Sequence, residues 1–303
     1  MSWNSGYIED KITEEDWAFG ASRPILKEDG QYDNDLPKEE HQKSKYFDSF
    51  ACTNYGVANA IETVARITLK VVWDKSDSFN AVGSGTVPGR GNSIGNACYD
   101  ARKGHGMINQ EDRPLPVDFR RNDFYAPLTQ EQSNKGKEFL TEYNIEYERV
   151  MGNQRSMMQA LKHSPLIVGG YAWYQKNGYY RSINRANHVF IVYGYVEGVY
   201  WKVFDSYPPY NKKLDWNFKF IGVRTIYLEK KNMEYNQSEI DNLIKRGFKY
   251  IMRVLGHGEI YELTSNGLKY LSKDEWNDIN VKRTADEEKL IGVPEELYLK
   301  IIK

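Results

Sequence analysis

The sequence predicts an α+β protein built around one long helix and one buried antiparallel hairpin. Apolar residues recur with helical spacing from Val57 to Thr68, which indicates a helix with one face in the core. Two apolar segments, 187–196 and 199–207, flank Glu197-Gly198 and are typical of paired strands joined by a tight turn. The first segment is apolar almost throughout, as expected for a strand that is covered on both faces.

The chain has 303 residues, enough for one large domain and a small one. We expect an extended N-terminal arm at 1–45, a main domain at 46–228 and a small α+β module at 229–303. The arm is charged and rich in turn residues, and a polar linker at 230–235 separates the main domain from the module.

Composition excludes several classes of protein. With 41 basic and 42 acidic residues the net charge is −1, so neither nucleic acid nor an anionic membrane is the expected partner. No apolar run approaches the ~18 residues of a membrane span, and the polar N-terminus is not a secretory signal, which predicts a cytoplasmic protein. Two cysteines form no disulfide framework, and the five histidines show no metal-ligand spacing. We therefore expect neither a metal nor another cofactor.

The first 45 residues carry scattered apolar side chains between turn signals such as Asp29-Gly30 and Leu36-Pro37. This pattern predicts an arm that packs over the main domain and is a candidate for binding a protein partner. A partly disordered tail is the alternative interpretation.

Cys52 lies at the predicted start of the long helix, where Asp48, Ser49 or Thr53 could cap the first turn. A helix N-terminus favours the thiolate and so lowers the pKa of a thiol. A lone cysteine is more often a small buried apolar residue, and this is what we expect of Cys98.

The segment between the helix and the hairpin contains simpler elements. The glycine-rich stretch 83–91 lacks the Lys-Ser/Thr of a phosphate-binding loop and is interpreted as the wall of a cleft. A helix is predicted at Gln130–Tyr143, followed by a short strand at Ile145–Met151.

The hairpin brings a histidine to a carboxylate. If Val196 pairs with Val199, Phe190 faces Asp205, and His188 lies on the same face two residues from Phe190. His188 and Asp205 are then diagonal neighbours at roughly 7–8 Å between backbones, within reach of each other's side chains. A one-residue bulge would place them on opposite faces. With Cys52 as the nucleophile, the sequence thus contains a candidate Cys-His-Asp triad.

The module after residue 228 contains little chemistry. We expect a helix at 238–248, strands at 250–255, 259–264 and 268–271, and two helical pieces at 274–278 and 294–302. Partner binding or anchoring is one interpretation of the module, and a purely structural appendage is the other.

Taken together, the ordered motifs resemble the papain-like cysteine peptidases. That family has a nucleophilic Cys at the start of a helix and a His about 130–150 residues later; here Cys52 and His188 are 136 apart (188 − 52) and Asp205 follows 17 later (205 − 188). The segments that carry the resemblance are Asn187–Tyr195, Tyr200–Tyr207, Met158–Val168, Asn177–Tyr180 and Gly89–Ser93.

The resemblance implies a two-lobed papain-like fold, with a helical lobe and an antiparallel β-barrel-like lobe. It implies cleavage of peptide bonds in a polypeptide substrate, with His188 as the base. Gln42 and the backbone N–H of Cys52 are then the oxyanion donors. The remaining candidates are the substrate-binding residues Gly89, Gly91, Asn92, Asn187 and Tyr207.

Three features depart from the family pattern. The third residue is Asp205 where the family usually has Asn, and we expect it to hold the imidazole through Nδ1–H. The Cys-Gly-Ser-Cys-Trp signature is absent, and Tyr46 occupies the position six residues before the nucleophile where the family has Gln. The arm is unlike the family's helical prosegment. This arrangement resembles papain-like proteins encoded by bacteriophages, which suggests virion association.

Three alternatives remain. A Cys-His-Asp hydrolase of cell-wall peptides and a bacteriocin-processing peptidase are both more compact, so the spacing of 136 residues argues against them. The third is a catalytically silent papain fold used as a structural or virion component.

Overall fold

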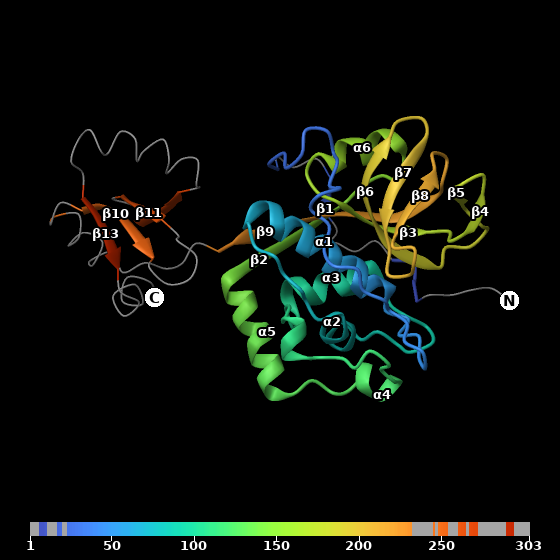
Figure 1. Ribbon diagram of the computed structural model, residues 1–303, viewed down its shortest axis with the longest axis horizontal. Helices are drawn as coiled ribbons and strands as arrows, with labels where there is room; N and C mark the ends of the chain where they lie inside the picture. Colours follow the sequence, from blue (N-terminus) through green and yellow to red (C-terminus); the bar gives the residue numbers. More distant parts are fainter. Residues whose placement is uncertain are drawn as a thin grey trace. The chain divides into compact units, whose positions relative to one another are not determined.

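The computed structural model describes residues 6–10, 17–19 and 23–231, together with Lys245 and four strands near the C-terminus (Figure 1). The chain divides into two compact units, Met1–Lys231 and Asn232–Lys303. Each unit is described by itself.

The first unit is built on one nine-stranded sheet with the order β1-β2-β9-β3-β6-β7-β8-β5-β4. Neighbouring strands are antiparallel, except for the parallel pairs β1–β2 and β5–β8. The strands are β1 (Trp17–Ala18), β2 (Tyr143–Arg149), β3 (Leu166–Gly170), β4 (Tyr174–Lys176), β5 (Tyr179–Arg181), β6 (His188–Val196), β7 (Tyr200–Phe204), β8 (Asn211–Asp215) and β9 (Phe220–Lys230).

Helix α1 separates this sheet from a group of smaller helices (Figure 1). Every residue of α1 from Cys52 to Ala65 is buried, because the helix packs on the sheet on one side and on α2 and α3 on the other. The helices are α1 (Cys52–Thr68), α2 (Asp77–Gly83), α3 (Ile94–Lys103), the 3₁₀ turn η1 (Gln110–Asp112), α4 (Arg121–Phe124), α5 (Gln130–Glu142) and α6 (Gln154–Leu161). The predicted α+β class and central helix are therefore confirmed.

The start of α1 approaches β6 closely. A Cβ atom added to Gly56 would lie 2.9 Å from Val189 Cγ1, so only glycine lets the helix and the strand meet without displacing that side chain. Gly56 is one helical turn after Cys52, and Val189 is adjacent to His188. The backbone therefore brings the first turn of α1 to the beginning of β6.

The β6–β7 hairpin reaches the predicted pairing by a different route. The two-residue turn was wrong: Val196 pairs with Tyr200, which leaves three residues in the turn. A bulge between Val192 and Gly194 then restores the register, so that Ile191 pairs with Phe204. The longer turn and the bulge each shift the register by one residue and cancel. The next position along, Phe190, therefore still faces Asp205.

The predicted cap of α1 was also wrong. Ala51 is the N-cap residue, and among the described residues no side chain caps this helix. The predicted capping side chains stabilise the loop before the helix instead: Asp48 Oδ1 accepts from the Phe50 N–H and Ser49 Oγ from the Ala51 N–H. By contrast, side-chain caps are present at α2, α3, α5 and α6.

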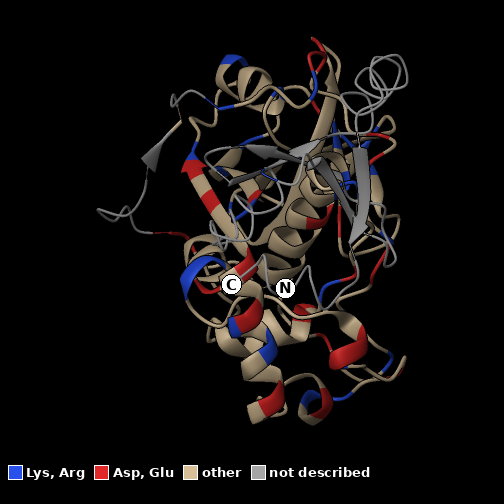
Figure 2. Cartoon of the chain, turned by 90° about the vertical axis from the view of Figure 1, so that its left-hand side faces the viewer, with Lys and Arg blue, Asp and Glu red and all other residues tan. Residues whose placement is uncertain are grey.

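The other predicted elements of this unit occur close to their expected positions. Helix α5 ends at Glu142, and β2 follows at once from Tyr143. The 41 basic and 42 acidic residues of the chain nearly balance. In the described part both kinds are interspersed along the chain (Figure 2).

The second unit contains a four-stranded sheet with the order β12-β11-β10-β13. Three of its strands overlap the predicted ones: β10 (Phe248–Arg253), β11 (Ile260–Thr264) and β12 (Gly267–Leu271). Strand β13 (Lys289–Val293) was not predicted and pairs in parallel with β10. The helices predicted at 238–248, 274–278 and 294–302 lie outside the described residues, apart from Lys245 and Phe248.

Candidate active site

Cys52 is the first residue of α1 and is fully buried. Phe50, two residues earlier, has a φ of 56°, a left-handed conformation that costs a non-glycine residue free energy. The loop therefore turns sharply into the helix, and the positive end of the helix dipole lies at the thiol.

His188, the first residue of β6, and Asp205, which follows β7, form a buried pair. His188 Nε2 and Asp205 Oδ1 are 2.5 Å apart, and both side chains are fully shielded from solvent. The expected bond through Nδ1 was therefore wrong, because Nε2 is the nitrogen that meets the carboxylate. Nδ1 consequently lies on the side of the ring turned away from Asp205.

Burial alone raises the pKa of the Asp205 carboxyl. The positive charges of His188 and Lys212, with their hydrogen bonds, outweigh burial and hold this pKa below its usual value. Asp205 is therefore a carboxylate at neutral pH.

Tyr207 lies beside the histidine and within electrostatic range of the thiol. Its ring centroid is 5.5 Å from that of His188. Burial, followed by the charges of Asp48, Cys52 and Asp205, holds the pKa of the Tyr207 phenol far above its usual value. The phenol is thus neutral and covers the histidine from one side. Trp173 covers another side, with ring centroids 5.5 Å apart and an interplanar angle of 90°.

Gln42 is buried in a network beside the pair. Its Oε1 accepts from Ser206 Oγ at 2.7 Å, and its Nε2 donates to Tyr207 Oη at 2.6 Å and to Asp48 Oδ1 at 3.1 Å. The Gln42 N–H also donates to the Ser206 carbonyl, which holds the loop in place. Both hydrogens of the Gln42 amide are therefore directed to protein acceptors in this structure. The loop thus brings Gln42, which lies ten residues before Cys52 in the sequence, to Ser206 and Tyr207, the two residues after Asp205.

The glycine-rich segment lies under the N-terminal arm. Gly89 and Gly91 have φ values of +80° and +88° and belong to a tight turn closed by hydrogen bonds between Val87 and Gly91. The backbone of Asn92 pairs with the arm: Ile8 N–H donates to Asn92 O, and Asn92 N–H donates to Gly6 O, both at 2.8 Å. The side chain of Asn92 points the other way, toward Ser84 and Thr86. Asn92 thus offers its backbone at this surface.

The arm is anchored by two further side chains. Tyr7 is only 6% exposed and packs against β3 and β9: Cβ atoms added to Gly169 and Gly222 would lie 2.8 Å from its ring and its hydroxyl. Asp10 accepts from the Gly95 N–H at the start of α3 and forms an ion pair of 3.2 Å with the buried Arg224.

Asn187 has its side chain engaged with the backbone of Ala172. Asn187 Nδ2 donates to Ala172 O, and Asn187 Oδ1 accepts from Ala172 N–H, both at 3.0 Å. This pair of bonds stabilises the loop after β3 and the entry to β6. The residue predicted to contact substrate therefore also has a structural task.

Lys212 was missed by the sequence analysis. Its ammonium lies 2.6 Å from Asp205 Oδ2 and is buried with it. The available signal was its position two residues before Leu214, because alternate residues of a strand share a face and Leu214 is buried. Asp48, which bonds Gln42 and Tyr207, was considered only as a helix cap.

Two general properties concern the described part of the chain. No group of three or more His, Cys, Asp or Glu residues there is arranged to hold a metal ion. No helix among the described residues is long and apolar enough to cross a membrane.

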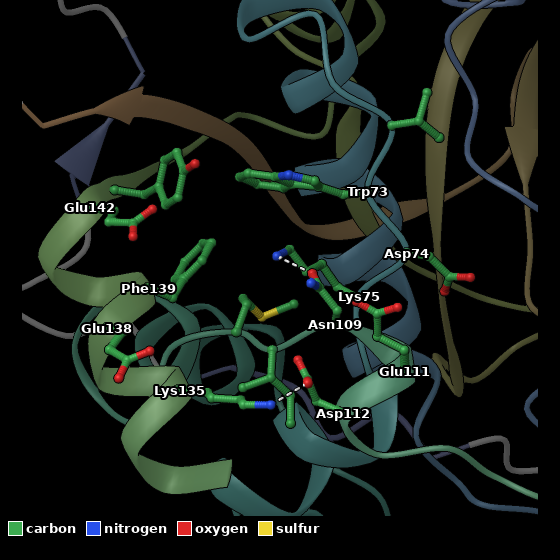
Figure 3. Close-up of a pocket in the computed structure, with 14 residues that line it drawn as sticks. Trp73, Asp74, Lys75, Asn109, Glu111, Asp112, Lys135, Glu138, Phe139 and Glu142 are labelled. Carbon is green, nitrogen blue, oxygen red and sulfur yellow. Dashed lines mark hydrogen bonds and ion pairs between the residues drawn. The ribbon is translucent and has the colours of Figure 1, made fainter. Parts of the chain in front are cut away.

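A separate pocket lies between α5, the segment that precedes α2 and the segment that follows α3 (Figure 3). It has a volume of about 550 Å³ and is lined by aromatic residues such as Trp73 and Phe139 and by several acidic side chains. Lys75 extends into it toward Asn109 (Figure 3). None of the predicted site residues lines this pocket.

No family model matches this sequence, and no curated protein matches it significantly. Solved structures do resemble it. Procathepsin L 3 from the larval midgut of Tenebrio molitor is 15% identical, with a TM-score of 0.53 over 74% of this chain and 76% of that chain. The cysteine protease and lectin-like domains of Cwp84, a surface-layer-associated protein of Clostridium difficile, are 12% identical, with a TM-score of 0.54 over 82% of this chain and 61% of that chain.

A second clostridial Cwp84 structure, solved after propeptide cleavage, is 11% identical, with a TM-score of 0.53 over 65% of this chain and 56% of that chain. The chain thus spans less than two thirds of either Cwp84 chain. These likenesses show that the chain has the papain-like fold.

Proposed function

We propose that this protein is a thiol-dependent peptidase that cleaves peptide bonds with Cys52, His188 and Asp205. The observation that supports this best is the buried His188–Asp205 pair, with Nε2 and Oδ1 at 2.5 Å, at the end of β6 that the first turn of α1 approaches. The papain-like fold of the neighbours agrees with this chemistry.

In the proposed reaction His188 Nδ1 takes the proton of the Cys52 thiol. The thiolate attacks the peptide carbonyl carbon and forms a tetrahedral oxyanion. The C–N bond then breaks, and His188 returns the proton to the leaving amine. Water hydrolyses the resulting thioester, which releases the acid and restores the thiol.

The oxyanion needs hydrogen-bond donors at the nucleophile. The backbone N–H of Cys52 lies at the start of α1, where the helix dipole adds to it. Gln42 supplies the second donor when its amide exchanges the bond to Asp48 for the substrate oxygen. The Gln42–Asp48 bond, at 3.1 Å, is the longer of its two donor contacts and is therefore the one that this exchange replaces.

The arm pairs with the segment that we propose binds substrate. Residues 6–8 contact the Asn92 backbone through an isolated parallel bridge with two hydrogen bonds, and Cys52 is fully buried. We therefore expect low activity in the intact chain until the arm moves. Ile8→Pro removes the N–H that donates to Asn92 and should weaken the arm without truncating the chain.

The test compares the intact protein, Ile8→Pro and Ile8→Pro/Cys52→Ala in hydrolysis of an unfolded polypeptide and in labelling by an epoxide thiol inhibitor. Loss of one hydrogen bond should raise both rates about tenfold in Ile8→Pro. Adding Cys52→Ala should abolish both, whereas adding Cys98→Ala, the matched control, should leave them unchanged. Hydrolysis that survives Cys52→Ala, or labelling at Cys98, would contradict the proposal.

The catalytically silent papain fold is favoured by one observation, the complete burial of Cys52, His188 and Asp205 beside the paired arm. It predicts no labelling of Cys52 in either the intact chain or Ile8→Pro. The remaining alternative is a hydrolase of cell-wall peptides. It predicts that the protein hydrolyses cell-wall peptides in preference to the unfolded polypeptide. Association with a virion stays a prediction from the sequence.

A further inference from the structure

The third residue of the proposed triad carries a charge where the family usually has a neutral amide. A buried carboxylate beside an imidazole favours the imidazolium strongly, because the surroundings screen the charge poorly. The structure places a second charge against the same carboxylate. Asp205 Oδ1 contacts His188, and Asp205 Oδ2 accepts from Lys212 Nζ at 2.6 Å.

Lys212 reaches this position from β8. The residue pairs with Val203 of β7, and the strand alternation turns its side chain inward, where it is 3% exposed. All three hydrogens of the ammonium have acceptors: Asp205 Oδ2 at 2.6 Å, and the carbonyl oxygens of Tyr207 and Pro209, both at 2.5 Å. A buried ammonium with three acceptors and a carboxylate partner is held in one position.

We propose that Lys212 is a positioning residue that neutralises Asp205, so that the ion pair presents to His188 an acceptor oxygen without net charge, as a neutral amide would. This inference rests on the proposed function and adds a fourth member to its site. It accounts for how the chain combines a papain-like fold with Asp205 in place of Asn.

Two opposite changes follow from the geometry. Lys212→Met leaves a buried carboxylate alone beside His188, which should move the titration of the His188 ring to higher pH. Asp205→Asn leaves a buried ammonium near the ring without its carboxylate, which should move this titration to lower pH. In the double variant Asp205→Asn/Lys212→Met both charges are gone, and the titration should return toward that of the starting protein.

Other titratable groups near this site must be controlled. Cys52 is replaced by Ala in the binding experiment below, and Asp48 faces Tyr207 rather than Lys212. Burial raises the pKa of the Tyr207 and Tyr180 phenols, so both stay neutral in the relevant range.

His41 is the group that could be confused with His188, because its ring lies 5.6 Å from that of Tyr207 and it senses both Asp205 and Lys212. Burial lowers the pKa of His41. Its NMR signal is identified by its loss in His41→Asn.

The first readout is an NMR titration of the His188 ring in full-length Cys52→Ala protein, with and without the substitutions. It does not require activity, so it tests the inference even if the proposed peptidase function fails. Lys213→Met is the matched control: Lys213 is the next residue on β8, is exposed, and lies over the Tyr200 ring. It should leave the His188 titration unchanged.

The second readout is the alkaline limb of the pH–rate profile for peptide hydrolysis in the Ile8→Pro background. It should shift upward in Lys212→Met, downward in Asp205→Asn and back in the double variant, with kcat/KM reduced about tenfold or more in each single variant. A merely structural role would give losses that accumulate in the double variant.

The inference is overturned if the His188 titration is the same in Lys212→Met as in the parent, if both single variants shift it in the same direction, or if the double variant lies no closer to the parent than they do. If Lys212→Met does not fold, the His188 titrations of Asp205→Asn and of the double variant still test the inference. A double variant with the parent titration supports the inference, and a displaced one overturns it. Expected NMR shifts without hydrolysis in any background would support the role of Lys212 and contradict the peptidase proposal.

Discussion

Lys75 and Lys212 are equally buried, with 5% of each whole residue exposed, but they have different partners. Lys212 donates to a carboxylate and two carbonyl oxygens at the proposed active site. Lys75 donates to the neutral amide of Asn109 at 2.8 Å and lies over the rings of Trp73, at 4.2 Å, and Phe139, at 5.0 Å. The same side chain therefore meets a full negative charge in one place and only dipoles and ring faces in the other.

The different partners affect how readily each buried ammonium loses its proton. Burial lowers the pKa of Lys75 to about 8, and the more distant charges of Glu62, Asp112 and Glu142 oppose this only in part. Burial also lowers the pKa of Lys212, but Asp205 opposes it through direct contact. A carboxylate in contact keeps Lys212 positive, whereas Lys75 titrates near the physiological range.

The largest expected effect is the loss of stability when Lys212 is replaced by an uncharged residue. Lys212→Met should lower the free energy of unfolding at pH 7 by about 3–5 kcal/mol, because it leaves Asp205 buried without its cation. Asp205→Asn/Lys212→Met should recover at least half of this loss. Denaturant unfolding of all three proteins measures it, and equal losses in the single and double variants would contradict the account.

The second effect concerns how the stability of the protein depends on pH through Lys75. Because the pKa of Lys75 is lower in the folded than in the unfolded chain, the folded protein binds fewer protons between about pH 8 and 10.5, and stability rises with pH there. Relative to Lys75→Met, which does not titrate, the parent should gain about 2–3 kcal/mol across this window. Unfolding curves of both proteins at several pH values measure this, and a constant difference would show that Lys75 is not depressed.

The third effect is chemical. At pH 8 a substantial fraction of Lys75 is neutral and faces the pocket of Figure 3, whereas the three hydrogens of Lys212 are engaged. A small amine-acylating reagent should modify Lys75 faster than Lys212, because only a neutral amine with a free lone pair reacts. Peptide mass spectrometry of native protein gives both rates, and faster modification of Lys212 would reverse the comparison.

The smallest effect is on catalysis from the distant lysine. Lys75→Met should change peptide hydrolysis in the Ile8→Pro background by less than about twofold, since the pocket contains none of the proposed site residues. A kcat/KM measurement beside Lys212→Met tests this. A loss as large as that of Lys212→Met would mean that the two regions are coupled.

Much of the fold was predictable because it depends on local pattern. The helical repeat after Cys52 and the apolar strand after His188 follow from spacing alone, and both occur as α1 and β6. The pairing of Phe190 with Asp205 was predicted from a turn that does not form. The result survived because the bulge before Gly194 cancels the extra turn residue. Sequence patterns constrain which faces meet more strongly than they constrain the path of the chain.

The partners of the site could not be predicted in the same way. Whether Gln42 meets Tyr207, and which nitrogen of His188 meets Asp205, depends on the position of a loop and on ring orientation. The contact of Ile8 with Asn92 joins segments that are 84 residues apart (92 − 8). No periodicity in the sequence encodes such a pairing.

The sequence by itself determined the helix that begins at Cys52, the strand that begins at His188 and the carboxylate of Asp205, because helical and strand periods are properties of short segments. The tertiary structure alone decided that Lys212 pairs with the Asp205 carboxylate and that the arm hydrogen-bonds to the backbone of Asn92. The physical reason is that a buried charge is compensated by whichever partner the packed strands bring within about 3 Å, and packing at that scale depends on the whole domain.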